Sequence, residues 1–298
     1  MRWLVLGAAA GGGFPQWNCA CPNCRAARAG DPHLRPRSQS SLAMALQGGD
    51  WLLVNAAPEL LQQIAQQPVL HPNNRQPRHS PLSHVLLTGG EIDQLAGLLS
   101  LRERHAFELR ATQRVLGILA ENRIFDALSG ECVTRRPLPL EEVWNLPGGA
   151  RLRLFAIPGK PPLYLEAQAE AEAEDTVAVE VEARDGRRAY YIPACHAVTA
   201  ALRERIQGAE LLLFDGTVWT DDEMARAGVG SRTGRQMGHQ PLSGADGSLA
   251  ALSGLDIGRK VLIHINNTNP VLREGSPERN EATAGGWEIA EDGLELSW

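Results

Sequence analysis

The stretch that decides the fold is "LLTGGEIDQLAGL", residues 86–98. It completes a short apolar run at 84–88 that is typical of a buried strand, passes through two glycines, and continues at 92–104 with the apolar spacing of a helix. Glu91 and Asp93 lie between strand and helix, where side chains face an open sheet edge. Their carboxylates are candidate cation ligands, and the alternative for Asp93 is a helix cap.

Outward from this stretch, short strands and helices alternate along the chain. The predicted strands are 2–7, 41–47, 50–56, 150–157, 176–183, 187–193, 210–217 and 260–266, and the predicted helices are 58–67, 198–207 and 248–255. Segment 70–83 and the acidic tract 166–175 are predicted loops. The pattern predicts an α/β fold and, because no break in composition divides it, one domain over residues 1–298.

Composition argues against several classes of partner. Of 298 residues, 43% are hydrophobic, 21% are charged and 5% are aromatic, and the net charge is −6. This balance, without a basic block, argues against nucleic-acid binding. No apolar run approaches the roughly 18 residues of a membrane span. The apolar run 3–6 is too short for a signal peptide and fits a buried first strand, so we expect a cytoplasmic protein.

Three of the five cysteines stand in "CACPNC", residues 19–24. An odd count with such clustering is unlike a disulfide framework. Cys19, Cys21 and Cys24 predict a zinc site, because three thiolates within one turn can converge on one thiophilic ion. The fourth ligand must come from a distant residue, and a site closed in this way is structural. A redox-active or accidental thiol cluster is the alternative.

Three further stretches carry candidate site residues. The buried strand in "FDGTVWTDDEM" ends at Asp215, a candidate acid of an α/β site, for which the alternative is a turn aspartate. "HINNTNPVL" begins with His264, which follows an apolar strand and is otherwise a satisfied core histidine. "MGHQPLSG" places His239 in a glycine-flanked loop that suits the rim of an active site. Nucleophile-elbow, phosphate-binding and dinucleotide-binding motifs are absent from the sequence.

Together with "VNAAPELLQQI" and "IDQLAGLLSLRE", these stretches fall in the order and spacing of the PqqB family, which the chain resembles from end to end. The family belongs to the metallo-β-lactamase superfamily and is linked to the biosynthesis of pyrroloquinoline quinone (PQQ). The resemblance implies a four-layer αββα sandwich with its site along one edge of the two sheets.

The superfamily pattern T-H-x-H-x-D-H is only partly present in the opening stretch. Its first two histidines fall at Gly89 and Glu91 and its last at Gln94, whereas Asp93 matches the aspartate. The resemblance therefore implies that one half of a dinuclear metal site is missing.

The resemblance also implies which residues remain to bind a metal. Asp215 matches the aspartate that bridges two metals in the superfamily, and His264 matches the last histidine ligand. The implied active-site ligands are Asp93, Asp215 and His264, with Glu91 as a candidate fourth. Carboxylates and imidazole suit Fe²⁺ or Mn²⁺ at least as well as Zn²⁺. The implied catalytic residues are Asp93, His264 and His239, the last as an acid or base or as a substrate contact at the rim.

Other residues receive roles only through the resemblance. In related phosphodiesterases with the C-x-C-x-x-C loop, a histidine at the position of Asn267 completes the zinc site, so the candidates for the fourth ligand here are Asn267, a nearby residue and water. His196 lies near the third histidine motif of the superfamily. Arg102 and Arg235 are candidates to meet substrate carboxylates.

The function implied by the resemblance is hydroxylation, with iron and O₂, of the tyrosine ring of a peptide-derived, cross-linked Glu–Tyr intermediate of PQQ biosynthesis. The alternative is a non-catalytic carrier that helps to move PQQ or its precursor to the periplasm. A zinc hydrolase is the third interpretation, and it lacks the ligands of a water-activating metal pair. The expected cofactors are structural Zn²⁺ and an active-site Fe²⁺ or other divalent metal. The expected partners are the precursor or PQQ itself and other PQQ biosynthesis proteins.

Overall fold

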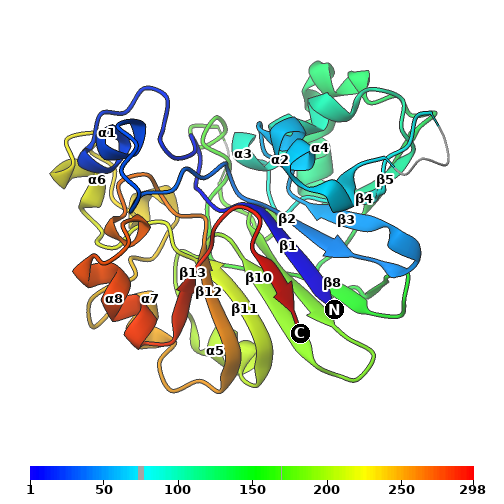
Figure 1. Cartoon of the computed structure of the whole chain (residues 1–298). Helices are drawn as coiled ribbons and strands as arrows, with labels where there is room; N and C mark the ends of the chain where they lie inside the picture. The colour runs from blue at the N-terminus through cyan, green and yellow to red at the C-terminus, as the bar shows by residue number, and fades with distance from the viewer. Residues whose placement is uncertain (73–76, 169) are drawn as a thin grey trace.

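The computed structural model describes residues 1–72, 77–168 and 170–298. Within these ranges the strands form two seven-stranded sheets that pack face to face, with helices on both outer faces (Figure 1). The predicted α/β class and the four-layer αββα order are confirmed. No helix in the described ranges has the length and apolarity to cross a membrane.

The first sheet combines strands from the first half of the chain with one strand from near residue 298. Its order is β14 (Glu295–Ser297), β1 (Arg2–Gly7), β2 (Ser41–Ala45), β3 (Trp51–Val54), β4 (Leu82–Leu86), β5 (Phe107–Ala111) and β6 (Val133–Pro137). Strands β3 to β6 run parallel, whereas β14, β1, β2 and β3 alternate in direction. The pairing of β14 with β1 brings the two chain ends side by side (Figure 1).

The second sheet uses the second half of the chain. Its order is β13 (Trp287–Ile289), β12 (Ile257–Ile263), β11 (Ala209–Asp215), β10 (Arg188–Ile192), β9 (Val177–Glu182), β8 (Arg151–Ala156) and β7 (Trp144–Asn145). Strands β10 to β13 are parallel, so their carboxyl ends share one edge of the sheet. That edge is where ligands gather in parallel sheets.

Alternating apolar side chains explain the layers. Residues such as Val54 and Leu213 meet between the sheets in one buried core. Neighbouring strand residues point outward, because successive side chains alternate across a strand, and helices cover them. Helices α2 (Leu60–Gln66) and α4 (Gln113–Glu121) pack on the first sheet, and α5 (Ala200–Ile206) and α8 (Pro277–Ala284) pack on the second. The remaining helices are α1 (Pro22–Arg28), α3 (Ile92–Leu95), α6 (Glu223–Arg226) and α7 (Ser248–Ala251).

The predicted strands and helices are present with shifted ends, except that the helix predicted over 92–104 is interrupted. It consists of α3 and a 3₁₀ segment, η3 (Ala96–Leu101). The Gly97 N–H bonds to the Ala56 carbonyl at 2.8 Å, and the Gln94 carbonyl accepts the Ala56 N–H at 2.7 Å. These contacts with the loop after β3 replace regular helical hydrogen bonds, so α-helical geometry stops at residue 95.

The predicted loops fall partly on residues outside the described ranges. Residues 73–76 of segment 70–83 lie outside them, and within the rest β4 already begins at Leu82. Residue 169 of the acidic tract 166–175 also lies outside the described residues, and the remainder of the tract forms turns and irregular backbone. The sequence patterns above do not predict strands β5, β6, β7, β13 and β14 or helices α1, α4, α6 and α8.

Candidate metal centre

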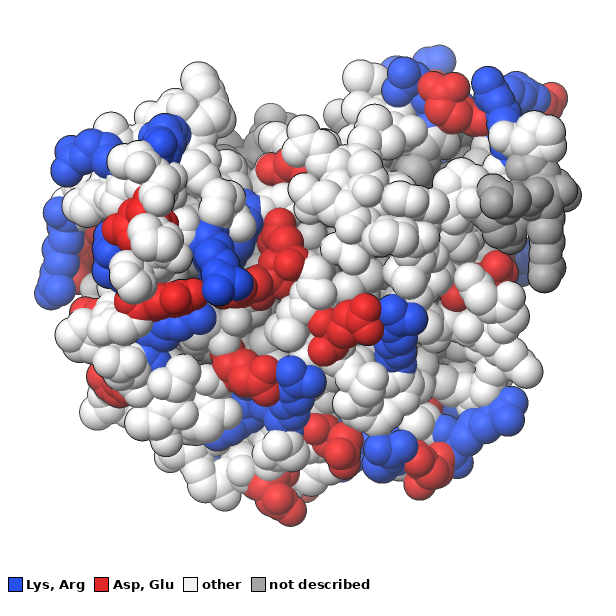
Figure 2. All heavy atoms as spheres, viewed as in Figure 1, with Lys and Arg blue, Asp and Glu red and all other residues white. Residues whose placement is uncertain are grey.

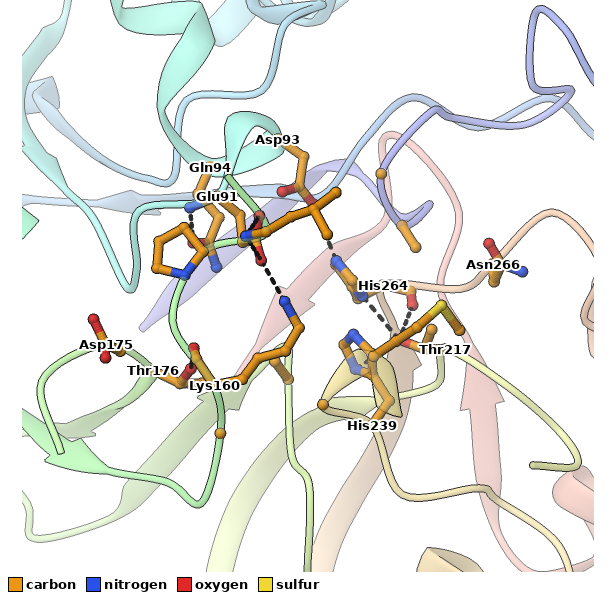
Figure 3. A pocket seen from close by; sticks show the side chains of 18 of the residues that line it. Glu91, Asp93, Gln94, Lys160, Asp175, Thr176, Thr217, His239, His264 and Asn266 are labelled. Carbon is orange, nitrogen blue, oxygen red and sulfur yellow. Dashed lines mark hydrogen bonds and ion pairs between the residues drawn. The ribbon is translucent and has the colours of Figure 1, made fainter. Parts of the chain in front are cut away.

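Four candidate side chains meet at the carboxyl ends of the central strands, and Figure 3 shows three of them, Asp93, His239 and His264. Asp93 lies at the start of α3, Asp215 ends β11, and His264 follows β12 directly. His239 comes from the loop after η5 (Arg235–Met237). Three of the four line a cavity of about 250 Å³, and Asp215 lies buried behind them.

Asp215 holds this group together. Its Oδ2 accepts the Cys195 N–H at 2.8 Å and lies 2.7 Å from His239 Nδ1, and its Oδ1 accepts the Thr217 hydroxyl at 2.6 Å. Burial favours a raised pKa, but the charge and hydrogen bond of His239 outweigh it and hold the pKa of Asp215 below its usual range. Asp215 is therefore an ionised acceptor with a defined orientation at neutral pH.

His264 points into the cavity because the backbone leaves the strand at this residue. Its φ of 58° is left-handed, a conformation that is uncommon outside glycine and is often retained at functional sites. Its Nε2 lies 3.1 Å from Asp93 Oδ2, and its ring stacks on that of His239 with centroids 5.2 Å apart. Burial favours a lowered pKa, but the hydrogen bond and charge of Asp93 outweigh it and raise the pKa of His264.

Thr217 is a site residue that was not predicted from the sequence. Its hydroxyl lies 3.1 Å from His239 Nδ1 and 2.9 Å from His264 Nδ1, in addition to its bond to Asp215. The available signal was its place two residues after the strand-end aspartate in "FDGT". The hydroxyl links the three side chains and restrains both imidazole rings.

The donor set of this cluster suits a divalent transition metal. Asp215, His239 and His264 offer ligand atoms that lie within 4.8 Å of one another. Two imidazoles and one carboxylate are the ligands of the facial sites in non-haem Fe²⁺ oxygenases. His239, predicted as an acid or base, thus lies among the side chains whose donor atoms could hold a metal ion. Asp93, predicted as a ligand, contacts Nε2 of His264 through its Oδ2 at 3.1 Å, and a carboxylate in such a position can orient the imidazole ring.

At the positions where the superfamily pattern has further histidines, Gly89, Glu91 and Gln94 pack against or bond to other protein atoms. A Cβ added to Gly89 would lie 2.4 Å from Gln94 Oε1, so this arrangement leaves no room for a histidine there. Gln94 Oε1 accepts the Glu91 N–H at 3.2 Å within a capping box. Glu91, the candidate fourth ligand, accepts from Lys160 Nζ at 2.8 Å and from the Leu163 N–H at 3.1 Å. Both side chains are therefore engaged by the protein itself.

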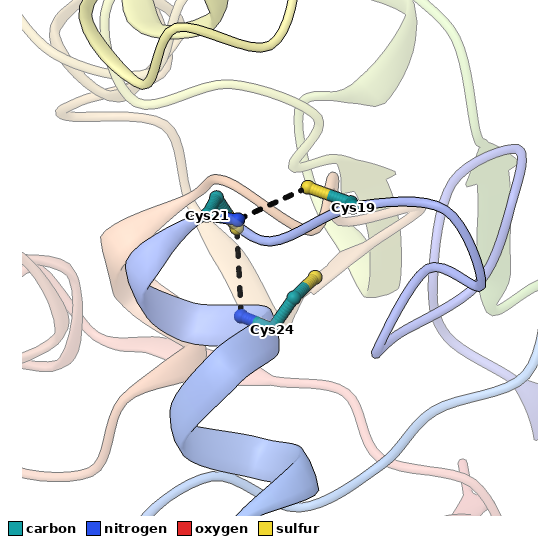
Figure 4. Close-up of side chains that lie close together, drawn as sticks. All are labelled: Cys19, Cys21 and Cys24. Atoms are coloured by element: carbon teal, nitrogen blue, oxygen red, sulfur yellow. Dashed lines mark hydrogen bonds between the residues drawn. The ribbon is translucent and has the colours of Figure 1, made fainter.

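The thiols of Cys19, Cys21 and Cys24 converge at the start of α1 (Figure 4). The side-chain amide of Asn267 lies against them, with Nδ2 3.1 Å from Cys19 Sγ and 3.3 Å from Cys24 Sγ. Rotation of this amide would present its oxygen to the same point. Burial raises the pKa of Cys21 to about 12 in the metal-free protein, so a metal that binds here must displace protons.

The turn after β12 connects the two clusters. His264 borders the cavity, and Asn267 contacts the thiols three residues later. The next residue, Thr268, donates its hydroxyl to Glu223 at 2.5 Å, and Glu223 also accepts the Trp219 N–H at 2.7 Å. Glu223 is 7% exposed, and burial raises its pKa to about 7. The stretches "FDGTVWTDDEM" and "HINNTNPVL" are thus joined through a buried carboxyl group.

Lys160 and Arg232 are the basic residues that line the cavity within the described ranges. The predicted candidates lie elsewhere: Arg102 pairs with Glu103, Arg235 pairs with Asp246, and neither lines the cavity. His196 is likewise absent from its wall. On the molecular face of Figure 2, acidic and basic side chains are interspersed.

Comparison with known proteins extends these observations. Residues 50–265 match the β-lactamase superfamily domain. The coenzyme PQQ synthesis protein B of Methylobacterium radiotolerans is 51% identical over 300 residues that cover 100% of both chains. The protein of the same name from Ruegeria pomeroyi is 52% identical and covers 99% of both.

Solved structures agree with this assignment. Zn(2+)-bound PqqB from Methylobacterium extorquens superposes with a TM-score of 0.96 at 50% identity, covering 100% of both chains. A diphosphatase from the PhnP family shares the fold, with a TM-score of 0.69 at 18% identity over 100% of this chain and 97% of its own. On the superfamily match and the full-length identity, the chain belongs to the PqqB family of coenzyme PQQ synthesis proteins, within the β-lactamase superfamily.

Proposed function

We propose that this protein acts in PQQ biosynthesis as a metal-dependent hydroxylase of the tyrosine ring of a peptide-derived, cross-linked Glu–Tyr intermediate. The family names of the relatives support the pathway. The observation that supports the chemistry is the cluster of Asp215, His239 and His264 beside a cavity. This donor set matches the facial sites of non-haem Fe²⁺ oxygenases.

Asp215, His239 and His264 would hold the active-site metal, and their donor atoms fit Fe²⁺ or another divalent ion. A redox-active ion bound there would supply the activation of O₂. Hydroxylation replaces one ring C–H by C–OH and converts the second oxygen atom to water. This balance takes up two electrons and two protons, and an external reductant such as ascorbate supplies the electrons.

The surrounding residues orient the ligands and hold protons. Asp93 accepts from His264 and keeps that ring in one orientation, and the Thr217 hydroxyl restrains the Nδ1 atoms of both rings. The raised pKa of His264 and the lowered pKa of Asp93 favour a proton between them in the metal-free protein. For Asp93, burial opposes this lowering and the hydrogen bond to His264 outweighs it.

We further propose that zinc binds at Cys19, Cys21 and Cys24. The zinc-bound relative with 50% identity supports the binding of zinc, and the three converging thiols support this location. Because Asn267 lies on the turn that begins at His264, zinc there would stabilise the position of the cavity wall.

Single-turnover oxygenation tests the hydroxylase proposal. The protein is loaded with Fe²⁺ without O₂, then mixed with ¹⁸O₂, ascorbate and a cross-linked Glu–Tyr peptide, and the products are read by mass. We expect incorporation of ¹⁸O by the wild type and its loss in His239→Ala and His264→Ala. His196→Ala, outside the cavity wall, is the matched control. Equal product mass gains in all variants would contradict the proposed site.

The second candidate function is a carrier for PQQ or its precursor. It is favoured by Gly89 and Gln94, which pack against each other at two positions where the superfamily pattern has metal-binding histidines. A carrier would bind PQQ at micromolar concentration without oxygen incorporation, and binding would survive the substitution of His264. The zinc hydrolase has no comparable support, because the residues of a metal pair are absent at these positions.

A further inference from the structure

Lys160 and Arg232, the two cations of the cavity wall, share an internal partner. Lys160 Nζ lies 2.8 Å from Glu166 Oε1, and Arg232 Nη2 donates to both Glu166 oxygens at 3.0 Å. Glu166 itself is absent from the cavity wall. A carboxylate of the protein therefore neutralises both cations that face the space where a ligand would bind.

The two cations differ in their free donors. Lys160 Nζ also contacts Glu91 at 2.8 Å and the Pro161 carbonyl at 3.4 Å, which takes up the three donors of an ammonium group. A carboxylate from a ligand can bind Lys160 only by replacing one of these acceptors. Arg232 uses Nη2 for its bonds to Glu166 and Gln236, so its Nε and Nη1 have no partner among the described residues.

Glu166 is the acceptor that can leave. Glu91 is held in place because both of its oxygens also accept the Leu163 N–H, at 3.1 and 3.2 Å. The ion pairs of Glu166, by contrast, go only to Lys160 and Arg232 within the described chain. Its side chain is 28% exposed, so water can solvate it after release. Ion pairs that solvent reaches are worth little in net free energy, so a competing carboxylate can exchange with this partly exposed one.

We propose that Lys160 and Arg232 form the carboxylate-binding subsite of the cavity, that Glu166 occupies this subsite as an internal substitute, and that a carboxylate of an aromatic polycarboxylate ligand displaces it. The ligand class rests on the proposed function, because both the Glu–Tyr intermediate and PQQ are aromatic polycarboxylates. Planar guanidinium and point-like ammonium groups are the usual partners of such carboxylates. The subsite selects carboxylates over uncharged aromatic molecules.

Equilibrium binding of PQQ to the protein as isolated, without O₂ or added iron, tests the subsite. We expect Lys160→Gln and Arg232→Gln each to weaken PQQ binding about tenfold, because a charge-assisted hydrogen bond is lost. Glu166→Gln should tighten binding roughly fivefold, because the competing carboxylate is gone. Binding of 9,10-phenanthrenequinone, a quinone without carboxylates, should respond to none of the three changes.

The control is Glu141→Gln, which alters the net charge as Glu166→Gln does. Glu141 pairs with Arg205 at 2.6 Å, and neither residue lines the cavity. Unchanged PQQ affinity in this variant excludes a general effect of charge. Weakened or unchanged binding in Glu166→Gln would overturn the proposal, as would the absence of PQQ binding by the wild type. Equal losses in all three cavity variants with lowered unfolding temperatures would also overturn it, because they indicate a purely structural role.

The binding test is independent of the oxygenation test. If the predicted order of affinities is found and no ¹⁸O is incorporated, the subsite stands and the hydroxylase proposal fails. If ¹⁸O is incorporated and the affinities do not follow the order, only the subsite fails.

Discussion

Replacement of Glu223 by glutamine should stabilise the protein above pH 7 and have little effect near pH 5. The pKa of Glu223 is raised from its ordinary 4.5 to about 7 by burial. The folded protein thus binds this proton more tightly than the unfolded chain, and its stability falls as the pH rises from about 4.5 through about 7. A tenfold change in proton affinity is worth about 1.4 kcal/mol, so the whole loss amounts to roughly 3 kcal/mol.

Glutamine mimics the protonated side chain because its amide can donate to Thr268 Oγ1 while its oxygen accepts the Trp219 N–H. We therefore expect the free energy of unfolding in urea to rise in Glu223→Gln by up to ~3 kcal/mol at pH 8, with most of this gain absent at pH 5. The exposed Glu210 on β11 supplies the control Glu210→Gln, which should show no such difference. A variant that loses equal stability at both pH values would refute the reasoning, because Glu223 would then act as a carboxylate throughout.

Three further predictions concern the metal clusters and the fold. Cys21→Ser should remove one zinc equivalent per chain in metal analysis and lower the unfolding temperature. Cys132→Ser, which lies outside the thiol cluster, should retain the zinc content and the unfolding temperature of the wild type. Equal zinc content in the two variants would contradict this. His239→Ala should weaken Fe²⁺ binding about 10- to 100-fold in anaerobic calorimetry. The control is His33→Ala, which should leave the affinity unchanged because His33 is exposed and does not line the cavity. Identical affinities in the two variants would exclude His239 as a ligand. Gly97→Ala should destabilise the fold by several kcal/mol (about 3 or more), because its Cβ would lie 2.1 Å from the Ala57 carbonyl. Gly117→Ala in α4, with nothing within 4 Å of the added Cβ, should be neutral or stabilising by about 0.5–1 kcal/mol, and urea unfolding compares the two.

Local patterns were sufficient to predict the central strands that carry site residues and the residues at their ends, but not β5, β6, β7, β13 or β14. Asp215 and His264 follow runs of apolar residues whose burial is evident from the sequence, and parallel strands bring such ends to one edge. Gly89 and Gln94 were recognisable as substitutions in a known pattern, although their packing against each other required coordinates.

Residues on loops were less predictable, because loop geometry depends on contacts that are distant in sequence. His239 was expected at the rim, and only the coordinates reveal its 2.7 Å contact with Asp215, which brings it into the candidate metal cluster. Lys160 and Arg232 stand on irregular segments without periodicity and were missed, whereas Arg102 and Arg235 were considered instead. The interruption after α3 likewise depends on the Ala56 backbone, which no local pattern around Gly97 reveals.

The position of β14 has a consequence for synthesis on the ribosome. Strand β1 pairs with β2 early, but its other edge is covered by β14, whose Glu295 bonds to Arg2 across 293 residues of chain. Until β14 has emerged, that edge presents unpaired backbone groups, which favour pairing with other nascent chains. We therefore expect slow translation near the last strand to increase aggregation of the nascent protein, and chaperones that bind emerging chains to protect β1 during this interval.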